Sequence, residues 1–505
     1  MNDSIESMRL LLELALNSGR KRKSQQTGYL HHCYHLVEHE PHLPIPLIEN
    51  FMFALALLRS RLVENIQEAK SIMDGLLHFQ NKNPQDQSFG NYPIYIHDFP
   101  NCKDRFIGIQ VAPVIYWILK QFHQVIGQDL KKRLEESLVM AVKHAILTSK
   151  DRQASYPTAV KIAAAAIATG QLVGDSLLSD EGSSLLESLR STPEESSLYC
   201  PVSMGSIATS LLMVYPHLID SPWKFFWDHL QSTWHRGTAS YAGPSLKEWQ
   251  QKFEPQVTLY DLICGYFSGV FSDRALKEAP VHLEAVLIPF TDERFQPLSY
   301  PYETTGEIQG IKWFLHQSEN LAFSFIDKGT IQINQAFEKG FHPFKLLWGD
   351  IHRVHSLVSQ GGTAAAVTFK HSREMEDDKT IQDFELDFDL DGAIEVEDKE
   401  KSREILLFAD AHEGIEFLVS GFKASTFKMD EMITMVDKYL SIQLSFHIIE
   451  GDGRFFGHRM LGNRPSQLAI KGEERFNAYD WQLFMRTINR SDKCRIKAKL
   501  RASIN

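Results

Sequence analysis

Residues 311–335 read IKWFLHQSENLAFSFIDKGTIQINQ, and this stretch decides the fold. Within IKWFLHQ, LAFSFID and TIQINQ, apolar and polar residues alternate, and aromatic and β-branched side chains are frequent. Successive side chains of a strand point to opposite faces of a sheet, so an alternation of period two predicts a strand. The stretch therefore predicts three successive β-strands.

The same alternation extends to both sides of this stretch. Its first segment is VHLEAVLIPF at residues 281–290, and its last is CRIKAKLRASI at residues 494–504. Turn signals separate the segments in the manner of hairpins, among them Asp-Gly at 391–392 and Gly-Asp-Gly at 451–453. Many strands with almost no intervening helix predict a large antiparallel β-sandwich over residues 278–505.

Before residue 278 the pattern is helical, and the helices come in pairs. Apolar residues recur at helical spacing from residue 48 to about 79 and then in three pairs, each joined by a short turn. The four alanines at residues 163–166 suit a close contact between helices in a buried layer. The predicted pairs are 106–125 with 130–147, 156–172 with 176–189, and 202–215 with 222–234.

Repeated helical hairpins without a strict sequence repeat predict an α-solenoid or a closed (α/α) toroid. We favour the toroid for residues 1–277, because the longer loops between pairs all fall at one end and could together form a cleft. The chain is therefore predicted to hold two domains, an N-terminal (α/α) toroid and a C-terminal antiparallel β-sandwich.

The bulk composition fits two folded domains. The chain has 505 residues, of which 43% are hydrophobic and 11% aromatic, as in globular proteins with large cores. Its net charge of -11 disfavours a general nucleic-acid binder, which would be basic. The 5 cysteines are scattered and form no CxxC pair, so neither a disulfide framework nor a thiolate zinc site is indicated.

The N-terminal residues 1–24 predict no targeting signal. Acidic residues precede the short apolar run and basic residues follow it, whereas a signal peptide has the opposite order. No apolar run approaches the about 20 residues that a membrane-spanning helix needs. We expect a cytoplasmic protein that binds neither membrane nor nucleic acid.

Residues 234–261, WHRGTASYAGPSLKEWQQKFEPQVTLYD, interrupt the helices with glycine and proline. A loop of this length in a compact domain is usually functional or disordered, and its aromatic content argues against disorder. We interpret it as lining a carbohydrate-binding cleft. The alternative is a structural cap whose aromatic rings pack on the rim of the helical domain. The polar and aromatic candidates in this loop are His235, Arg236, Tyr241, Trp249, Gln250 and Glu254.

A second loop, NYPIYIHDFPNCKDR at residues 91–105, offers Tyr95, His97 and Asn101. Loops on a rigid scaffold often carry binding residues, which favours a place in the same cleft. The alternative is a proline-fixed connector whose tyrosines pack locally. From the predicted β-domain, His352 is a further candidate for contact with a ligand.

One segment resembles a calcium-binding loop. In DFDLDGAIEVED, residues 387–398, the positions Asp387, Asp389, Asp391 and Asp398 match acidic positions of an EF-hand. However, the flanks alternate like strands, and Asp-Gly at 391–392 suits a hairpin turn. We favour the hairpin, keep Ca²⁺ as the alternative, and assign no other metal or cofactor.

The order of a helical toroid and a large β-sandwich resembles the heparinase II/III-like and alginate/chondroitin lyase-like superfamily. SYAGPSLKEWQ at 240–250 and HPFKLLWGD at 342–350 are similar to segments of that superfamily. The resemblance implies cleavage of an acidic polysaccharide by β-elimination, with no obligatory cofactor. It implies a base that removes the proton beside the uronate carboxylate, groups that neutralise this carboxylate, and an acid for the leaving oxygen. Tyr241 and His235 are the candidates for proton transfer, and Arg236 and Asn101 for the carboxylate clamp.

Two other functions stay open. Toroids also host glycoside hydrolases, which need two carboxyl groups, and Glu248, Glu254, Asp98 and Asp104 are available. A non-catalytic glycan-binding or scaffold protein with the same architecture is the alternative from another class. Serine-centred catalysis has little support from sequence, because the Gly-x-Ser-x-Gly motif does not occur.

Overall fold

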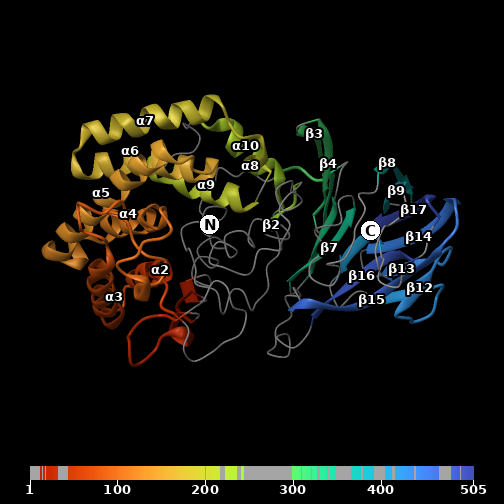
Figure 1. Cartoon of the computed structure of the whole chain (residues 1–505), viewed down its shortest axis with the longest axis horizontal. Coiled ribbons are helices and arrows are strands. Elements are labelled where there is room, and N and C mark those ends of the chain that lie inside the picture. The colour runs from red at the N-terminus through yellow and green to blue at the C-terminus, as the bar shows by residue number, and fades with distance from the viewer. Residues whose placement is uncertain are drawn as a thin grey trace. The chain divides into compact units, whose positions relative to one another are not determined.

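The computed structural model forms two compact units (Figure 1). The described residues up to Ser232 make up the first, and those from Thr233 onward make up the second. The predicted domain boundary at 277/278 lies outside the described residues and stays a prediction. The described residues are 12–13, 15–17, 19–31, 44–199, 201–215, 222–235, 240–243, 298–308, 310–319, 321–326, 330–337, 340–348, 366–376, 379–391, 404–411, 416–436, 440–465, 479–488 and 491–504.

The first unit consists of helices in the positions that the sequence predicts. Each of the three predicted pairs is present, with ends that shift by a few residues. The helices are α2 (Leu47–Arg59), α3 (Val63–Leu76), α4 (Ile107–Ile126), α5 (Gln128–Asp151), α6 (Tyr156–Val173), α7 (Ser176–Ser191), α8 (Glu195–Leu198), α9 (Pro201–Val214) and α10 (Lys224–Thr233), with 3-10 turns η1 (Leu77–Phe79) and η2 (Ile96–Asp98).

The stretch predicted as helical from 48 to about 79 is divided between α2 and α3. Arg61 adopts a positive φ of 57°, which ends α2 and turns the chain. Ser60 Oγ donates to the Leu57 carbonyl at 2.6 Å and accepts from Asn65 Nδ2 at 2.8 Å. The apolar period continues across this turn, which explains why periodicity alone does not reveal the break.

The helices pack as stacked hairpins. α3 packs against α2, α5 against α4, and α7 against α6. Further contacts join one hairpin to the next: α2 packs against α4, α4 against α6, and α6 against α9 (Figure 1). Each hairpin thereby buries its apolar side against the next one, as in solenoids and toroids.

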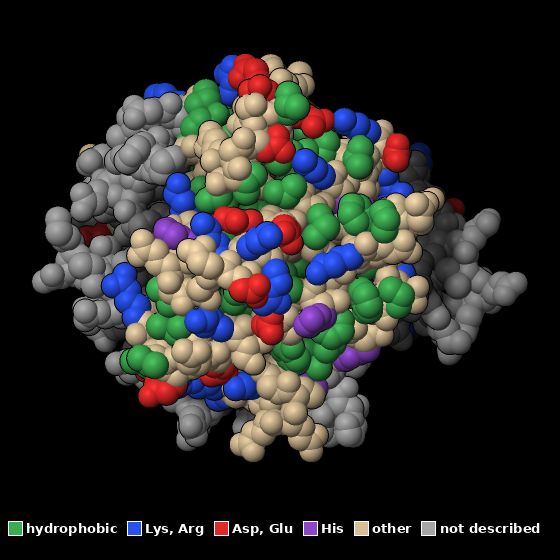
Figure 2. Space-filling model, turned by 90° about the vertical axis from the view of Figure 1, so that its left-hand side faces the viewer, with side chains coloured by type: hydrophobic (Ala, Val, Ile, Leu, Met, Phe, Trp, Pro, Cys, Tyr) green, Lys and Arg blue, Asp and Glu red, His purple; other side chains and the backbone are tan. Residues whose placement is uncertain are grey.

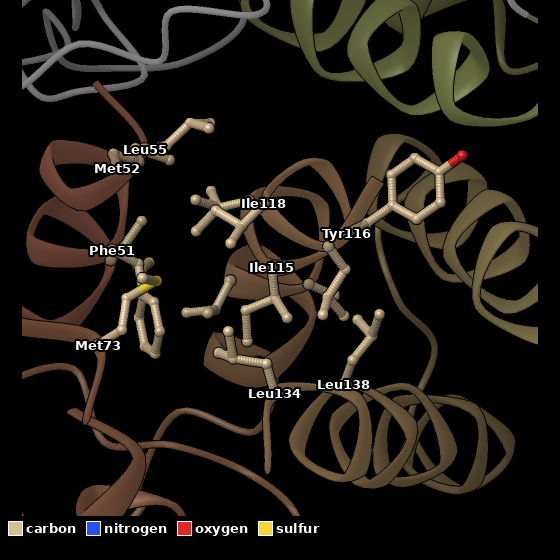
Figure 3. Close-up of a cluster of buried hydrophobic side chains, with 14 of the residues drawn as sticks. Phe51, Met52, Leu55, Met73, Ile115, Tyr116, Ile118, Leu134 and Leu138 are labelled. Atoms are coloured by element: carbon tan, nitrogen blue, oxygen red, sulfur yellow. The ribbon is translucent and has the colours of Figure 1, made fainter. Parts of the chain in front are cut away.

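The core of this unit lies between α2, α3, α4 and α5 (Figure 3). α3 and α5 contribute side chains from one face, whereas α2 is buried all round from Leu47 to Leu58. Burial of apolar surface is the main favourable contribution to folding. Figure 3 labels the buried residues Phe51, Met52, Leu55, Met73, Ile115, Tyr116, Ile118, Leu134 and Leu138.

The run of alanines at 163–166 lies at a close contact between α6 and α7, as predicted. Gly182 of α7 is buried there. A Cβ atom on Gly182 would lie 2.8 Å from the Ala163 carbonyl oxygen and 2.8 Å from the Ala166 Cβ. Small side chains on both helices therefore allow the two backbones to approach.

We expect Gly182→Ala to lower the free energy of unfolding by about 1–2 kcal/mol. At an open helix position, replacing glycine by alanine stabilises the helix by about 1 kcal/mol. A loss of stability in Gly182→Ala would therefore come from the steric contact. Urea unfolding measures the effect. Ser183→Ala, at the exposed next position of α7, is the control and should be neutral or slightly stabilising. A stabilising Gly182→Ala would contradict the close approach.

The second unit contains antiparallel sheets, as predicted. A nine-stranded sheet has the order β12-β15-β16-β10-β7-β6-β5-β4-β3, and a six-stranded sheet has the order β11-β13-β14-β17-β9-β8. IKWFLHQ forms β4, and the next two segments of the opening stretch form β5 and β6. The strands are β3 (Tyr302–Ile308), β4 (Ile311–Gln317), β5 (Leu321–Ile326), β6 (Thr330–Phe337), β7 (Gly340–Trp348), β8 (Ala366–Glu376), β9 (Lys379–Asp391), β10 (Glu404–Ala411), β11 (Glu416–Val419), β12 (Thr426–Lys428), β13 (Ile433–Val436), β14 (Leu440–Glu450), β15 (Arg454–Pro465), β16 (Tyr479–Ile488) and β17 (Lys493–Ile504).

The turn at 451–453 was predicted to close a hairpin, and this is wrong. β14 pairs with β13 and β17, whereas β15 pairs with β12 and β16. The chain therefore crosses from one sheet to the other at this turn, where Gly451 has a φ of 87°. Phe427 of β12 and Phe446 of β14 are buried and their rings stack at 6.0 Å, so one strand of each sheet is in contact here.

One face of the six-stranded sheet carries a ladder of ion pairs between β9 and β17. Arg501 donates to both carboxylate oxygens of Asp383, at 2.7 and 2.8 Å. Lys497 Nζ lies 3.2 Å from Glu385 Oε2 and 3.6 Å from Asp387 Oδ1. The acidic alternation of β9 is thus matched by a basic alternation on the neighbouring strand.

Candidate functional site

The loop between η1 and α4 is held by buried amide side chains. Asn91 is fully buried; its Nδ2 donates to the Asp104 carbonyl at 2.7 Å, and its Oδ1 accepts from the Gly108 N–H at 2.8 Å. Gln80 Nε2 donates to the carbonyls of Gly90 and Ser137 at 2.8 and 2.9 Å. These bonds satisfy the loop backbone and fix its course.

Tyr92 has a structural role in this loop. Its side chain is fully buried, and its hydroxyl lies 2.7 Å from Ser137 Oγ. Burial raises the pKa of Tyr92 far above its usual value. The ring packs edge-on against Phe51 at 5.9 Å, which ties the loop to the core.

Two predicted binding residues of the loop come together. The rings of Tyr95 and His97 stack, 6.4 Å apart and within 10° of parallel. His97 is exposed and Tyr95 is half-buried, and His97 Nε2 accepts from the Ile45 N–H at 3.3 Å. Asn101 lies exposed in the turn that follows η2. We name the stacked Tyr95 and His97 rings the aromatic platform.

The first residues of the loop predicted at 234–261 form a short hairpin in the second unit. β1 (Trp234–His235) pairs with β2 (Ser240–Tyr241), with His235 opposite Ser240. The sequence placed these residues among the helical loops, but their contacts are with the sheet unit. His235 Nε2 lies 2.7 Å from the carbonyl oxygen of Ser318, directly after β4, and its ring lies 5.9 Å from that of Tyr300.

His235 is a buried, neutral histidine. Its side chain is 0% exposed, and burial lowers its pKa to about 4, while the Ser318 hydrogen bond acts in the opposite direction. A carbonyl oxygen only accepts hydrogen bonds, so Nε2 of the neutral ring carries the proton and Nδ1 carries the lone pair.

A carboxylate–histidine pair between β3 and β4 was not predicted. Glu303 of β3 stands opposite His316 of β4, and Glu303 Oε1 lies 2.7 Å from His316 Nδ1. His316 is buried and lies two residues before Ser318, the hydrogen-bond partner of His235. The sequence predicts that IKWFLHQ is a strand, but it does not predict the contact of Glu303 with His316. This contact depends on the register between the two strands.

Lys161 is a second group that the sequence did not single out. It lies in α6, is buried, and its Nζ donates to Gln110 Oε1 of α4. Burial lowers the pKa of Lys161 to about 8. Strongly shifted pKa values mark functional sites and structural networks alike, and the pairing with Gln110 provides the structural explanation.

The other predicted residues divide into three groups. Tyr241 is described by its backbone in β2, opposite Trp234. Asn101 belongs to the helical unit and His235 to the sheet unit. The residues Arg236, Trp249, Gln250, Glu254 and His352 lie outside the described residues and stay predictions.

The calcium alternative also stays a prediction, since residues 392–398 lie outside the described part of the chain. Within it, Asp387 and Asp389 lie in β9, and Asp387 makes ion pairs with Lys497 and Arg495 at 3.6 and 3.9 Å. Among the described residues, no group of three or more His, Cys, Asp or Glu side chains could hold a metal ion. None of the described helices is long and apolar enough to cross a lipid bilayer.

The helical unit presents a mixed surface. On the face in Figure 2, basic and acidic side chains are interspersed among the coloured residues, without an area of one sign. Ion pairs of the unit follow this pattern, with Arg133 at 3.0 Å from Asp129 and Lys150 at 2.8 Å from Glu181. A mixed surface does not steer a charged molecule over long range.

Comparisons with known proteins give matches to solved structures only. No protein-family model matches the sequence, and no curated protein matches it. Heparinase III is 10% identical, with a TM-score of 0.46, over 98% of this chain and 84% of the other. Xanthan lyase from Paenibacillus is 9% identical, with a TM-score of 0.43, over 100% of this chain and 57% of the other. Heparan sulfate lyase HepC from Pedobacter heparinus is 9% identical, with a TM-score of 0.40, over 99% and 83%. The chain is similar in fold to these proteins.

Proposed function

We propose that this protein is polysaccharide-lyase-like and cleaves an acidic glycan by β-elimination. In this proposal the stacked helical hairpins form an (α/α) toroid and the two sheets a β-sandwich. Helical hairpins followed by antiparallel sheets support this architecture. The stacked Phe427 and Phe446 rings support the sandwich.

The neutral state of His235 carries the proposal. A base must be unprotonated to remove the proton beside a uronate carboxylate. Burial lowers the pKa of His235 to about 4, which keeps the imidazole neutral at neutral pH and also makes it a weaker base. The ring of Tyr300 lies 5.9 Å from that of His235, and its hydroxyl is a further group that can transfer a proton. Tyr241 is then the acid for the leaving oxygen, and Arg236 with Asn101 the carboxylate clamp.

The aromatic platform supports a glycan as the ligand. Tyr95 and His97 present parallel rings in a loop whose backbone is fixed by Asn91. Aromatic rings offer flat apolar area with polar edges, which suits the mixed surface of a sugar. Substrate would contact this platform with the exposed amide of Asn101 nearby in the same loop.

A non-catalytic glycan-binding protein is the second candidate. The full burial of His235 and its bond to a backbone carbonyl favour this function, because both are typical of a structural histidine. The aromatic platform would then be the binding site.

Incubation with uronate-containing and neutral glycans tests the proposal. We expect the ultraviolet absorbance of an unsaturated uronate with the acidic glycans, and a rate at least about 100-fold lower for His235→Gln. His229→Gln is the matched control, since His229 is also a histidine with a pKa lowered to about 4, but lies in the helical unit. Reducing ends without this absorbance would indicate hydrolysis. Binding without either product would leave the non-catalytic function, and an unchanged His235→Gln rate would remove His235 from the reaction.

A further inference from the structure

Three side chains on the six-stranded sheet form a serine–histidine–aspartate array. Ser445 Oγ lies 3.0 Å from His447 Nε2. His447 Nδ1 lies 2.7 Å from Asp430 Oδ1. Both distances are those of hydrogen bonds, and the order of atoms is that of a nucleophile, a base and a group that orients the base.

The fold holds this array in place. Ser445 and His447 are two residues apart in β14, so their side chains lie on the same face of the strand. Asp430 lies in the turn between β12 and β13, where it adopts a positive φ of 64°. Its backbone N–H donates to the Phe446 carbonyl at 2.8 Å, which fixes the turn against the strand between the other two members.

The hydrogen bonds define the roles of the imidazole nitrogens. A carboxylate only accepts, so His447 donates its Nδ1 proton to Asp430. In the neutral ring Nε2 then carries the lone pair and accepts from the Ser445 hydroxyl. His447 can therefore remove the proton of Ser445 without rearrangement, and Asp430 stabilises the charge that develops on the ring.

Residues with hydrogen-bond donors share the face of the sheet that carries Ser445. Lys499 of β17 stands opposite Ser445, and Lys497 stands opposite His447. Gln443 lies two residues before Ser445 in β14 and is exposed. Lys497 and Lys499 pair with Glu385 of β9 at 3.2 and 3.9 Å, so the strand next to Ser445 carries ammonium groups on this face. Ammonium groups can stabilise the negative oxygen that forms when a carbonyl is attacked. Ser445 is buried, whereas the side chains of His447 and Asp430 are 34% and 72% exposed, so the array reaches solvent through its histidine and aspartate.

We propose that Ser445 is the nucleophile of an esterase site for small acyl groups, with His447 as base and Asp430 as orienting group. The Ser445 proton passes to His447 Nε2 as Oγ bonds to the carbonyl carbon. The ester C–O bond then breaks, and His447 returns the proton to the leaving alcohol. Water, deprotonated by His447, attacks the acyl-serine, which releases the acid and restores the hydroxyl. The site is independent of the proposed glycan cleavage.

A fluorophosphonate probe tests the site on the full-length protein. Oγ bonds to phosphorus and fluoride leaves, which gives a stable adduct that peptide mass spectrometry locates. We expect labelling of Ser445 in the folded protein and none at Ser445 after heat denaturation. Hydrolysis of 4-nitrophenyl acetate is expected to be blocked by the same labelling.

Three variants and a control define the outcome. Ser445→Ala should abolish the labelling at this position, and His447→Gln and Asp430→Asn should each slow it by about 100-fold or more. Ser441→Ala is the matched control, because Ser441 lies on the same face of β14 outside the array. Circular dichroism confirms that each variant is folded. Wild-type protein that stays unlabelled at Ser445, or labelling that is unchanged in His447→Gln, would overturn the proposal.

Discussion

Lowering the pH from about 6.5 to about 4 is expected to reduce the free energy of unfolding of the sheet unit by about 3 kcal/mol through His235 alone. Burial lowers the pKa of His235 from 6.5 to about 4. A pKa difference of one between the folded and unfolded states changes the free energy of unfolding by about 1.4 kcal/mol. The unfolded chain binds a proton at this residue below pH 6.5, whereas the folded protein does not until near pH 4. The stabilisation is therefore complete above pH 6.5 and lost as the pH falls.

Urea unfolding at several pH values between 7 and 4 measures this loss. His235→Gln should remove about 3 kcal/mol of the pH dependence, since glutamine keeps an N–H for the Ser318 carbonyl but does not titrate. His229, whose pKa is also lowered to about 4 by burial, leaves a residual dependence in the helical unit. His123→Gln, at an exposed position of α4, is the control and should follow the wild type. A His235→Gln curve parallel to that of the wild type would mean that the histidine is not neutral when folded.

Local patterns predict elements better than they predict pairing. IKWFLHQ is β4 from its first residue to its last, because the alternation that defines a strand lies within seven consecutive residues. The turn at 451–453 is also real, but its two strands belong to different sheets. The pairing of strands depends on long-range packing, such as the contact of Phe427 with Phe446. The alternation of apolar and polar residues within a strand does not predict such a contact.

In the candidate sites, too, contacts between residues close in sequence are easier to predict than contacts that depend on strand pairing. Tyr95 and His97 are two residues apart, and their stacking follows from one local turn. Glu303 and His316 meet only through the register of β3 and β4. Asp430 reaches His447 only because its turn is fixed against β14, so a local motif such as Gly-x-Ser-x-Gly does not mark this array.

Phe51→Ala is expected to lower the free energy of unfolding of the helical unit by about 3–5 kcal/mol. Phe51 is 0% exposed in the core between α2, α3, α4 and α5 (Figure 3), so truncation leaves a cavity in a closely packed interior. Chemical denaturation of wild type and variant measures the loss. Phe422→Ala is the matched control, because it removes the same atoms from a side chain that is 76% exposed and should change stability by less than about 0.5 kcal/mol.

The substitution should also loosen the loop that carries the aromatic platform. Phe51 packs against Tyr92, whose hydroxyl is bonded to Ser137, and Tyr92 directly follows the buried Asn91 that fixes the loop backbone. We therefore expect the Gly108 amide, which donates to Asn91, to exchange its proton faster in Phe51→Ala than global destabilisation alone explains. Phe51→Leu refills most of the cavity and should restore much of the stability while leaving Tyr92 without its aromatic partner. Equal exchange rates at Gly108 in Phe51→Leu and wild type would show that the cavity, and not the ring contact with Tyr92, connects the core to the loop.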